Sequence, residues 1–377
     1  GAMRAKNREI LESNATAKLI DGHARFLSDT EVEVTAGEDK LVVTADCFII
    51  NTGAVATIPP IPGARESKRV LTSTELQKIT PRPKRLGIIG GGPIGVEFAG
   101  IFSSYGTEVT LLEGAPALFG RYDDDVAQAA REIIADQGIT AHAGVRVETV
   151  TDNADSVTVN YLDSEGASKH LEVDYVMVAT GRKPATEGLG LENTSIETTE
   201  HGAIVVDEHL RTTAPNIFAL GDVNGGPQFT YISLDDYRVV LSQLLGDGSR
   251  STKDRQAVAA TIYMNPPLSF VGLTERDALA AGHTIKVAAK PVAAIAAMPR
   301  AKTLENPRGI MKFVIDAETD QILGAQLLVV ESMEVINLVA LAMRHNITAS
   351  QLRDEIYTHP SITEGLNEVL AVAQPVA

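Results

Sequence analysis

The sequence is poor in cysteine, in tryptophan and in long apolar runs. Its 377 residues include one cysteine, Cys47, and no tryptophan. A single thiol excludes an intramolecular disulfide framework and is typical of a reducing compartment, so we predict a cytoplasmic protein. No apolar run approaches the length that a membrane-spanning helix needs, so no membrane partner is predicted.

Basic residues are also in the minority. There are 33 lysines and arginines against 49 aspartates and glutamates, which gives a formal net charge of −16. No basic block offsets this charge, so a nucleic-acid partner is not expected. We predict no bound metal either. The length allows two or three domains, each with its own core. The opening Gly1-Ala2-Met3 is typical of an expression scar and is left out of the fold prediction.

The clearest chemical signal is a glycine-rich turn. An apolar run that ends at Ile89 continues as GGGPIG, with the G-x-G-x-x-G glycines at Gly90, Gly92 and Gly95. Gly90 permits a tight turn, Gly92 lets a phosphate approach the backbone, and Gly95 lets the next helix pack close to the strand. Apolar residues then recur at helical spacing, so the positive end of the helix dipole would face a pyrophosphate. The alternative is an ordinary turn without a ligand.

An acid follows at the distance expected for a ribose contact. Glu113 ends the predicted strand Glu108–Leu112 and lies 18 residues after Gly95. A carboxylate there binds ribose hydroxyls and repels a 2′-phosphate, which favours NAD(H) over NADP(H). Arg121 lies close enough in sequence to leave NADP(H) open, and a strand-end carboxylate can also be merely solvated.

Elsewhere the pattern alternates between β-rich and mixed segments. Hairpins are predicted from short β segments before residue 51, and a β-meander from segments between residues 145 and 173. Tyr175–Ala179 predicts a buried parallel strand, and Asp123–Gln137 a helix whose acidic start is solvated. Two apolar strands end on Thr-Gly, at Thr52-Gly53 and Thr180-Gly181, which predicts two crossings between domains. The segment from Gln256 onward predicts an α+β domain.

Two further motifs carry polar residues in suggestive places. Gly221 and Asp222 follow the short apolar strand of TAPNIFALGD, where open α/β sheets bind ligands. The alternative for Asp222 is a helix cap. Near the end, His359 and Glu364 flank a proline turn in THPSITE, an arrangement that is either catalytic or structural.

Four of these motifs agree with one family. GGGPIGVE, VATGRKP, TAPNIFALGD and HPSITE, in this order, resemble the flavoprotein pyridine nucleotide-disulfide oxidoreductases, which include glutathione reductase, lipoamide dehydrogenase and mercuric reductase. The resemblance covers essentially the whole chain. PQFTYISLDDYR and NPPLSFVGLTE are most similar to the bacterial reactive-chlorine-resistance branch, the hypothiocyanous acid reductases.

The resemblance implies a hydride path from a nicotinamide through FAD to a redox disulfide. It also implies an acid–base pair, His359 held by Glu364, and a homodimer formed through the C-terminal domain. The implied NAD(P) residues are Gly90, Gly92, Pro93, Ile94, Gly95, Glu113 and Gly181. The implied FAD residues are Thr52, Gly53, Glu97, Arg182, Gly221, Asp222, Phe229 and Thr230.

The chain also departs from the family pattern. The first flavin G-x-G-x-x-G and the C-x-x-x-x-C pair are absent, as is the region that carries the lysine partner of Glu97. Pro93 stands where several members carry an aromatic gate. We therefore expect a cut after the first half of the FAD domain, a loss on the order of 100 residues, which would leave apolar faces and strand edges exposed.

The expected fold class is α/β. It comprises Rossmann-like nucleotide-binding domains with a central β-meander and a C-terminal α+β dimerisation domain. The expected domains are an FAD-domain remnant (1–84), an NAD(P)-binding domain (85–183), the second part of the FAD domain (184–255) and the dimerisation domain (256–377).

The parent protein is expected to be an NAD(P)H-dependent flavoprotein reductase of a small disulfide-like or oxidised sulfur substrate. The chain itself is expected to be inactive, as a redox-dead NAD(P)-binding and dimerisation fragment. A two-domain dehydrogenase that acts on a carbonyl is disfavoured, because it leaves Asp222 and the His359–Glu364 pair without a shared purpose.

Overall fold

The computed structural model describes residues 2–376, so Gly1 and Ala377 lie outside it. The chain forms two compact units. Unit 1 holds the residues up to Val55 together with Arg182–Asp254, and unit 2 holds Ala56–Gly181 together with the residues from Arg255 onward. The chain therefore leaves and re-enters unit 1 shortly after the two Thr-Gly pairs, where the sequence predicts the crossings. None of the described helices is long and apolar enough to cross a bilayer.

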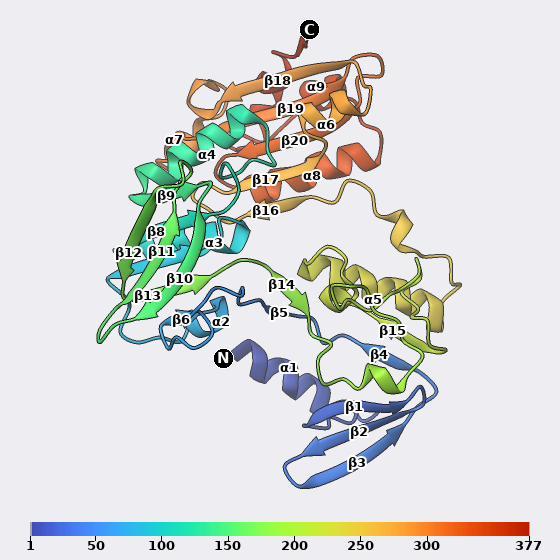
Figure 1. The fold of residues 1–377 in the computed structure, drawn as a ribbon. Helices are drawn as coiled ribbons and strands as arrows, with labels where there is room; N and C mark the ends of the chain where they lie inside the picture. Colours follow the sequence, from blue (N-terminus) through green and yellow to red (C-terminus); the bar gives the residue numbers. More distant parts are fainter. Residues whose placement is uncertain (1, 377) are drawn as a thin grey trace. The chain divides into compact units, whose positions relative to one another are not determined.

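Unit 1 is built from hairpins and one long helix (Figure 1). Its helices are α1 (Ala2–Glu12) and α5 (Thr230–Leu245), with short 3₁₀ turns η1 (Leu191–Asn193), η2 (Gly221–Asn224) and η3 (Thr252–Asp254). An antiparallel sheet contains β1 (His23–Ser28), β2 (Glu31–Ala36) and β3 (Asp39–Thr44). A parallel pair contains β4 (Phe48–Ile50) and β15 (Ile217–Ala219). A β segment expected at Leu19-Ile20 is not a strand in the structure.

Several apolar side chains of unit 1 face solvent. Ile49 of β4 is 50% exposed, although its neighbour Ile50 is buried. One row of α5 is also exposed, and it consists of Tyr231, Leu234, Tyr237, Leu241 and Leu244. The opposite side of α5 supplies Val239 and Val240 to a small core with Phe218. The helix thus has apolar residues on two sides, of which one is covered.

The first part of unit 2 is a parallel sheet with three helices and a meander. The sheet order is β6 (Val70–Leu71), β13 (Tyr175–Val178), β7 (Arg85–Ile89), β8 (Glu108–Glu113) and β9 (Ile139–Ala143). The helices are α2 (Ser73–Leu76), α3 (Pro93–Ser104) and α4 (Asp124–Asp136). The meander is β10 (Arg146–Asp152), β11 (Val157–Leu162) and β12 (Ser168–Val173). The buried parallel strand and the meander are where the sequence predicts them.

The chain passes from unit 1 to unit 2 before residue 84, the expected end of the first domain segment. The sequence groups residues 1–84 together, whereas in the structure Ala56 and the residues that follow belong to unit 2. The reason is that β6 pairs with β13 at the edge of the parallel sheet. The strands β5 (Ala54–Ala56) and β14 (Arg182–Pro184) pair where the chain passes between the units.

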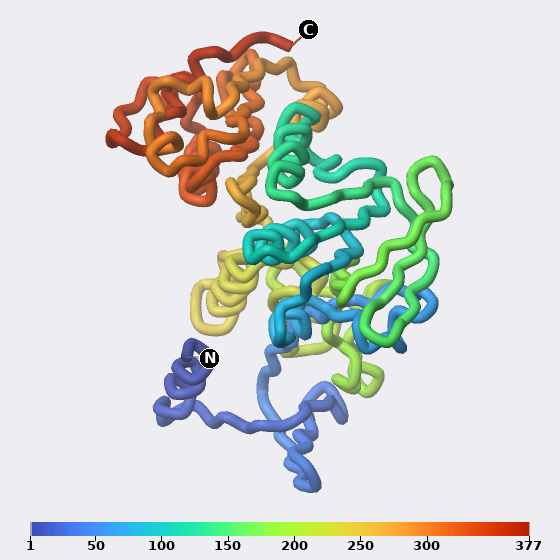
Figure 2. The backbone as a smooth tube through the Cα atoms, turned by 90° about the vertical axis from the view of Figure 1, so that its left-hand side faces the viewer, coloured from blue at the N-terminus to red at the C-terminus, as the bar shows by residue number. Residues whose placement is uncertain are grey.

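The C-terminal part of unit 2 is an antiparallel sheet with helices, drawn in orange and red in Figure 2. Its strand order is β16 (Ala260–Ile262), β17 (Leu268–Gly272), β20 (Ile322–Leu328), β19 (Ile310–Asp316), β18 (Ile285–Pro291) and β21 (Gln374–Pro375). The helices are α6 (Glu275–Ala280), η4 (Val292–Ala294), α7 (Pro299–Thr303), α8 (Ser332–Arg344), α9 (Ala349–Asp354) and α10 (Gly365–Leu370). The expected α+β domain is confirmed, although β17, α7, α10 and β21 were not predicted.

A buried ion cluster joins the two parts of unit 2. Lys312 of β19 is 5% exposed, and its Nζ lies 2.9 Å from Glu275, 3.0 Å from Asp125 and 3.4 Å from Asp123. Asp123 also accepts hydrogen bonds from the Glu275 N–H and the Gln326 amide. The interpretation of this acidic run as a solvated helix start is therefore wrong for Asp123, which is 7% exposed.

This cluster predicts a large effect for a change at Lys312. Lys312→Met leaves the buried carboxylate of Asp123 without a cation, so we expect the free energy of unfolding to fall by about 3–5 kcal/mol. The matched control is Lys286→Met, since Lys286 lies on β18 in a half-exposed pair with Asp320 at 2.8 Å. That change should cost about 1 kcal/mol or less. Urea unfolding measures both, and equal losses would contradict a special role for Lys312.

Candidate functional site

The glycine turn has the geometry that its sequence predicts. It links β7 to α3, and Gly90 adopts a φ of 109°. A Cβ on Gly90 would lie 2.5 Å from the Ala179 oxygen, and one on Gly95 would lie 1.9 Å from the Gly90 oxygen. A Cβ on Gly92 would meet nothing within 4 Å. The turn is therefore crowded on its protein side at Gly90 and Gly95 and open at Gly92, which is where a phosphate would approach.

The start of α3 is free of side-chain capping. Gly92 is its N-cap and forms no side-chain hydrogen bond, and Pro93 takes the first helical position, where a missing N–H costs nothing. The first N–H groups of a helix have no partner within the helix, so those of Ile94 and Gly95 can donate to an anion. Gly106, with a φ of 80°, follows the end of the helix.

Glu113 lies beside the turn, at the end of β8. Its carboxylate accepts a hydrogen bond from the Gly91 N–H and another, of 2.6 Å, from the Ala115 N–H. The half-buried side chain thus fastens the glycine turn to the loop after β8. Arg121 lies farther along this loop and lines a cavity with residues of the C-terminal part. Among residues 2–376, no contact between Arg121 and Glu113 is recorded.

In unit 1, Gly221 and Asp222 form the 3₁₀ turn η2 directly after β15. Gly221 has a φ of 66°, and a Cβ there would lie 2.9 Å from both Asn51 Oδ1 and Ser233 Oγ. The Gly221 N–H donates to Asp236, a residue of α5 that is 1% exposed, at 2.7 Å. Asp236 was not predicted, and its signal would have been an acid on the buried side of an otherwise amphipathic helix. In the described chain no hydrogen bond to the Asp222 carboxylate is recorded, so that group can accept one from a ligand.

Of the other residues that the resemblance links to FAD, all but Glu97 also lie in unit 1. Thr52 Oγ1 donates to the Ala185 oxygen at 2.8 Å, and Arg182 donates to the Ala54 oxygen. Gly53 has a φ of 74°, with open space where a Cβ would lie. Phe229 and Thr230 begin α5 and are exposed, and the Phe229 ring stacks on that of Tyr231 with centroids 5.0 Å apart.

Gly181 and Glu97 belong to unit 2. Gly181 has a φ of 120°, and its oxygen accepts from the Thr57 N–H at 3.1 Å. Glu97 lies on α3, and its Oε1 accepts from the Tyr263 N–H at 2.9 Å. This backbone donor, next to β16, occupies the glutamate for which the resemblance implies a lysine.

His359 and Glu364 meet in the C-terminal part, as predicted. His359 Nδ1 lies 2.9 Å from Glu364 Oε2, and the Ser361 N–H donates to Glu364 Oε1 at 2.9 Å. Burial acts to raise the pKa of Glu364, but the hydrogen bonds from Ser361 and His359 lower it overall. The His359 side chain is 69% exposed while that of Glu364 is 11% exposed. A buried carboxylate thus orients an exposed imidazole, the arrangement that acid–base histidines need.

Cys47 lies just before β4 and is half-buried. Burial raises the pKa of its thiol, which keeps it protonated at neutral pH and makes it a poor nucleophile. Between residues 2 and 376, no group of His, Cys, Asp and Glu side chains is arranged to hold a metal ion.

Comparison with known proteins gives consistent results. Residues 3–236 match the pyridine nucleotide-disulphide oxidoreductase family, and residues 258–370 match the dimerisation domain of that family. The chain is 44% identical to the pyridine nucleotide-disulfide oxidoreductase RclA of Escherichia coli, covering 99% of this chain and 82% of RclA. It is 35% identical to a mercuric reductase of Staphylococcus aureus, covering 92% of this chain and 62% of that protein.

Solved structures point to the same relative. The HOCl-induced flavoprotein disulfide reductase RclA from Escherichia coli superposes with a TM-score of 0.93 at 44% identity, over 98% of this chain and 83% of that one. Its Cu(II) complex gives a TM-score of 0.94 at 44% identity, over 98% and 82%. The family, the branch and the α/β fold class expected from the motifs are therefore confirmed. The expected cut and the expected inactivity stay predictions.

The open space at Gly92 predicts that a substitution there changes NADH affinity without changing the stability of the fold. Gly92→Ala introduces a methyl group into free space, so the fold should keep its melting temperature, while NADH affinity falls at least about tenfold because the phosphate loses its approach. The matched control is Gly100→Ala on the same helix, where a Cβ also meets nothing within 4 Å. It should stabilise α3 by about 1 kcal/mol and leave NADH affinity unchanged. Fluorescence titration with NADH measures both, and equal affinities for the two variants would contradict the assignment.

Proposed function

Because this chain belongs to the pyridine nucleotide-disulphide oxidoreductase family, we propose that it binds NAD(H) at the glycine turn of unit 2. The parent activity would be an NAD(P)H-dependent flavoprotein reduction of a disulfide-like or oxidised sulfur substrate. The observation that carries this proposal is the contrast within the turn, where Gly90 and Gly95 are crowded by protein and Gly92 is open.

The residues around the turn fit a dinucleotide. The uncapped start of α3 offers backbone donors to a pyrophosphate, and the helix dipole adds a favourable field. Glu113 lies at the adjoining strand end, where its carboxylate can take ribose hydroxyls and repel a 2′-phosphate. These features support NAD(H) as the preferred nucleotide.

The residues of unit 1 fit one part of a flavin nucleotide. The carboxylate of Asp222 has no recorded partner in the described chain, and Gly221 allows backbone to approach a ligand closely. FAD, when bound, would supply a centre that takes a hydride and passes electrons on singly or in pairs. Asp222 would hold a ribityl hydroxyl, and the exposed Phe229–Thr230 segment would lie beside the ring. Thr52, Gly53, Glu97 and Arg182 remain proposals of the same kind.

The C-terminal part would provide proton handling and assembly. His359, oriented by Glu364, would protonate a departing thiolate. The match to a dimerisation domain supports a homodimer through this part of the chain. An oxidised sulfur substrate is supported by the similarity to RclA, a flavoprotein disulfide reductase that is induced by HOCl.

The alternative is a redox-inactive NAD(P)-binding and dimerisation fragment. The observation that favours it is that Cys47 is the one cysteine of the sequence, so no dithiol can form within this chain. The raised pKa of the Cys47 thiol also argues against its acting as a lone nucleophile.

A visible absorption spectrum of the purified chain separates the two functions. The reductase predicts a yellow protein whose flavin band bleaches when NADH is added without oxygen. The fragment predicts a colourless protein that still binds NADH. A protein that neither absorbs in the visible range nor binds NADH would contradict both.

The nucleotide preference has its own test at Glu113. Glu113→Ala should weaken NADH binding by about tenfold, because a charged acceptor for the ribose is lost, and should weaken NADPH binding less. Glu113→Gln is the control for the hydrogen bonds to Gly91 and Ala115, since it keeps one acceptor oxygen. Titration of each variant with both nucleotides measures the effect, and equal losses for NADH and NADPH would remove the case for NAD.

A further inference from the structure

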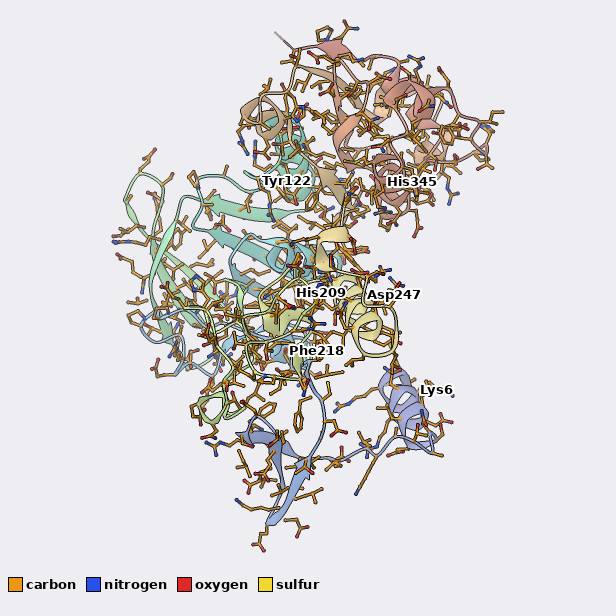
Figure 3. The ribbon with its side chains drawn as sticks, turned by 90° about the vertical axis from the view of Figure 1, so that its right-hand side faces the viewer. Lys6, Tyr122, His209, Phe218, Asp247 and His345 are labelled. Carbon is orange, nitrogen blue, oxygen red and sulfur yellow. The ribbon has the colours of Figure 1, made fainter. Side chains whose placement is uncertain are left out.

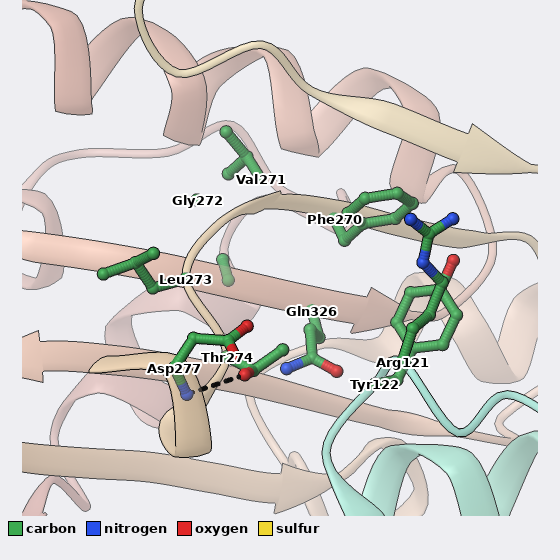
Figure 4. A pocket seen from close by; sticks show the side chains of 10 residues that line it. Arg121, Tyr122, Phe270, Val271, Gly272, Leu273, Thr274, Asp277 and Gln326 are labelled. Atoms are coloured by element: carbon green, nitrogen blue, oxygen red, sulfur yellow. Dashed lines mark hydrogen bonds between the residues drawn. The ribbon is translucent and has the colours of Figure 1, made fainter. Parts of the chain in front are cut away.

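The cavity that Arg121 lines lies within unit 2, apart from the residues proposed to bind NAD(H) or FAD. Its volume is about 160 Å³. It is lined by Arg121 and Tyr122 from the loop before α4 and by residues of β17, α6 and β20, among them Phe270, Asp277 and Gln326. Figure 3 places Tyr122 where the first part of unit 2 meets the C-terminal part. Figure 4 shows Arg121 and Tyr122 at one end of the cavity and Asp277 with Thr274 at the other.

Tyr122 presents a buried polar atom without a partner. The residue is 3% exposed, and its hydroxyl is the one buried side-chain N or O atom of the described chain for which no hydrogen bond is found. Its ring meets the edge of Phe270 with centroids 5.2 Å apart. Leaving such a hydroxyl unpaired costs about 1–3 kcal/mol, so a group that accepts a hydrogen bond from it would be bound favourably.

Neighbouring polar groups do not meet this need. The Gln326 amide is already used twice, since its oxygen accepts from the Asp123 N–H at 3.0 Å and its nitrogen donates to Asp123 at 2.6 Å. At the far end, Thr274 Oγ1 accepts from the Asp277 N–H at 3.1 Å. Within the described chain the Tyr122 hydroxyl thus has no acceptor, and a bound ligand can supply one.

The charges around the hydroxyl define what that acceptor is. Burial raises the pKa of Tyr122 to about 12, against the opposing effect of the Arg121 charge, so the hydroxyl remains a donor at neutral pH. Arg121 adds a guanidinium, which can only donate. Two donors at one end favour an anionic oxygen, whereas the Asp277 carboxylate at the other end repels a second negative charge. The walls between them include Phe270, Val271 and Leu273 and are apolar.

We propose that this cavity binds a small organic monocarboxylate. Its carboxylate accepts hydrogen bonds from the Tyr122 hydroxyl and from Arg121, and its apolar body packs against Phe270 and Leu273. The volume suits a ligand with one ring, because an engineered apolar cavity of about 150 Å³ accommodates benzene. The site is separate from nucleotide binding and stands whether or not the chain turns over a substrate.

Binding at this place would also affect stability. Tyr122 directly precedes Asp123, whose carboxylate joins the Lys312 cluster between the two parts of unit 2. A ligand that contacts both the loop at Tyr122 and the strand at Phe270 binds only when these parts are together. It should therefore raise the melting temperature, and the rise should follow the logarithm of its concentration once that exceeds the Kd.

The test uses the full chain and benzoate as the probe. Calorimetric titration should detect binding of benzoate to the wild type, with benzyl alcohol, which is neutral and of similar size, at least tenfold weaker. Tyr122→Phe removes only the unpartnered hydroxyl, so it should leave the melting temperature unchanged or raised while benzoate affinity falls about tenfold. Arg121→Met should lower the benzoate affinity by a similar factor, because it removes a donor to the carboxylate. The fold should be unaffected, since Arg121 is exposed.

Tyr161→Phe serves as the matched control, because Tyr161 is a buried tyrosine of β11 that does not line the cavity. It should keep the wild-type affinity. The proposal is overturned if benzoate does not bind the wild type, or if Tyr122→Phe binds it equally well. It is also overturned if a crystal soaked in benzoate holds only water in the cavity, or if Tyr122→Phe is less stable than the wild type, which would mean that the hydroxyl has a structural partner.

Discussion

The arrangement of unit 2 depends on one buried cation. Lys312 reaches from the C-terminal sheet to the start of α4, where Asp123 and Asp125 lie within 3.4 Å of it. A charge in that position is tolerable only because carboxylates surround it, so the two parts are held in one register. The loop that leads to Asp123 carries Leu118, which lies against the glycine turn at Gly91. The same loop carries Tyr122 into the cavity. The glycine turn and the cavity are thus both in contact with the loop that leads to Asp123.

Short-range sterics explain which features the sequence predicts. Gly90, Gly92 and Gly95 take distinct roles because each contact, or its absence, arises within one turn of chain and its adjacent strands. The sequence predicts the parallel strand β13 correctly because burial on both faces of a strand produces an unbroken apolar run. His359 and Glu364 are five residues apart, so their meeting needs only the local turn. The four motifs also identify the protein family, which local geometry alone does not.

Long-range contacts explain what the sequence does not predict. Lys312 and Asp125 are 187 residues apart, and neither the lysine on β19 nor the acidic helix start differs locally from a solvated one. Asp236 likewise has no local feature that distinguishes it from a solvated acid on a helix. Its burial depends on the contact of α5 with Gly221, whose N–H donates to it. The strand β6 is two residues long and gains its place from pairing with β13, which puts the residues from Ala56 to 84 in unit 2. Such assignments require the tertiary contacts themselves.

The single cysteine of the sequence limits which reactions the chain can carry out by itself. The proposed nucleotide binding would use the open backbone at Gly92 and the carboxylate of Glu113, and the proposed proton transfer would use the His359 imidazole that Glu364 orients. Reduction of a disulfide needs a thiolate that attacks and a second thiol that resolves the intermediate. Cys47 is alone in the sequence, half-buried and with a raised pKa. The acid–base role proposed for His359 would therefore need a thiol that the given sequence does not contain, and the proposed hydride transfer and substrate reduction would place distinct requirements on the molecule.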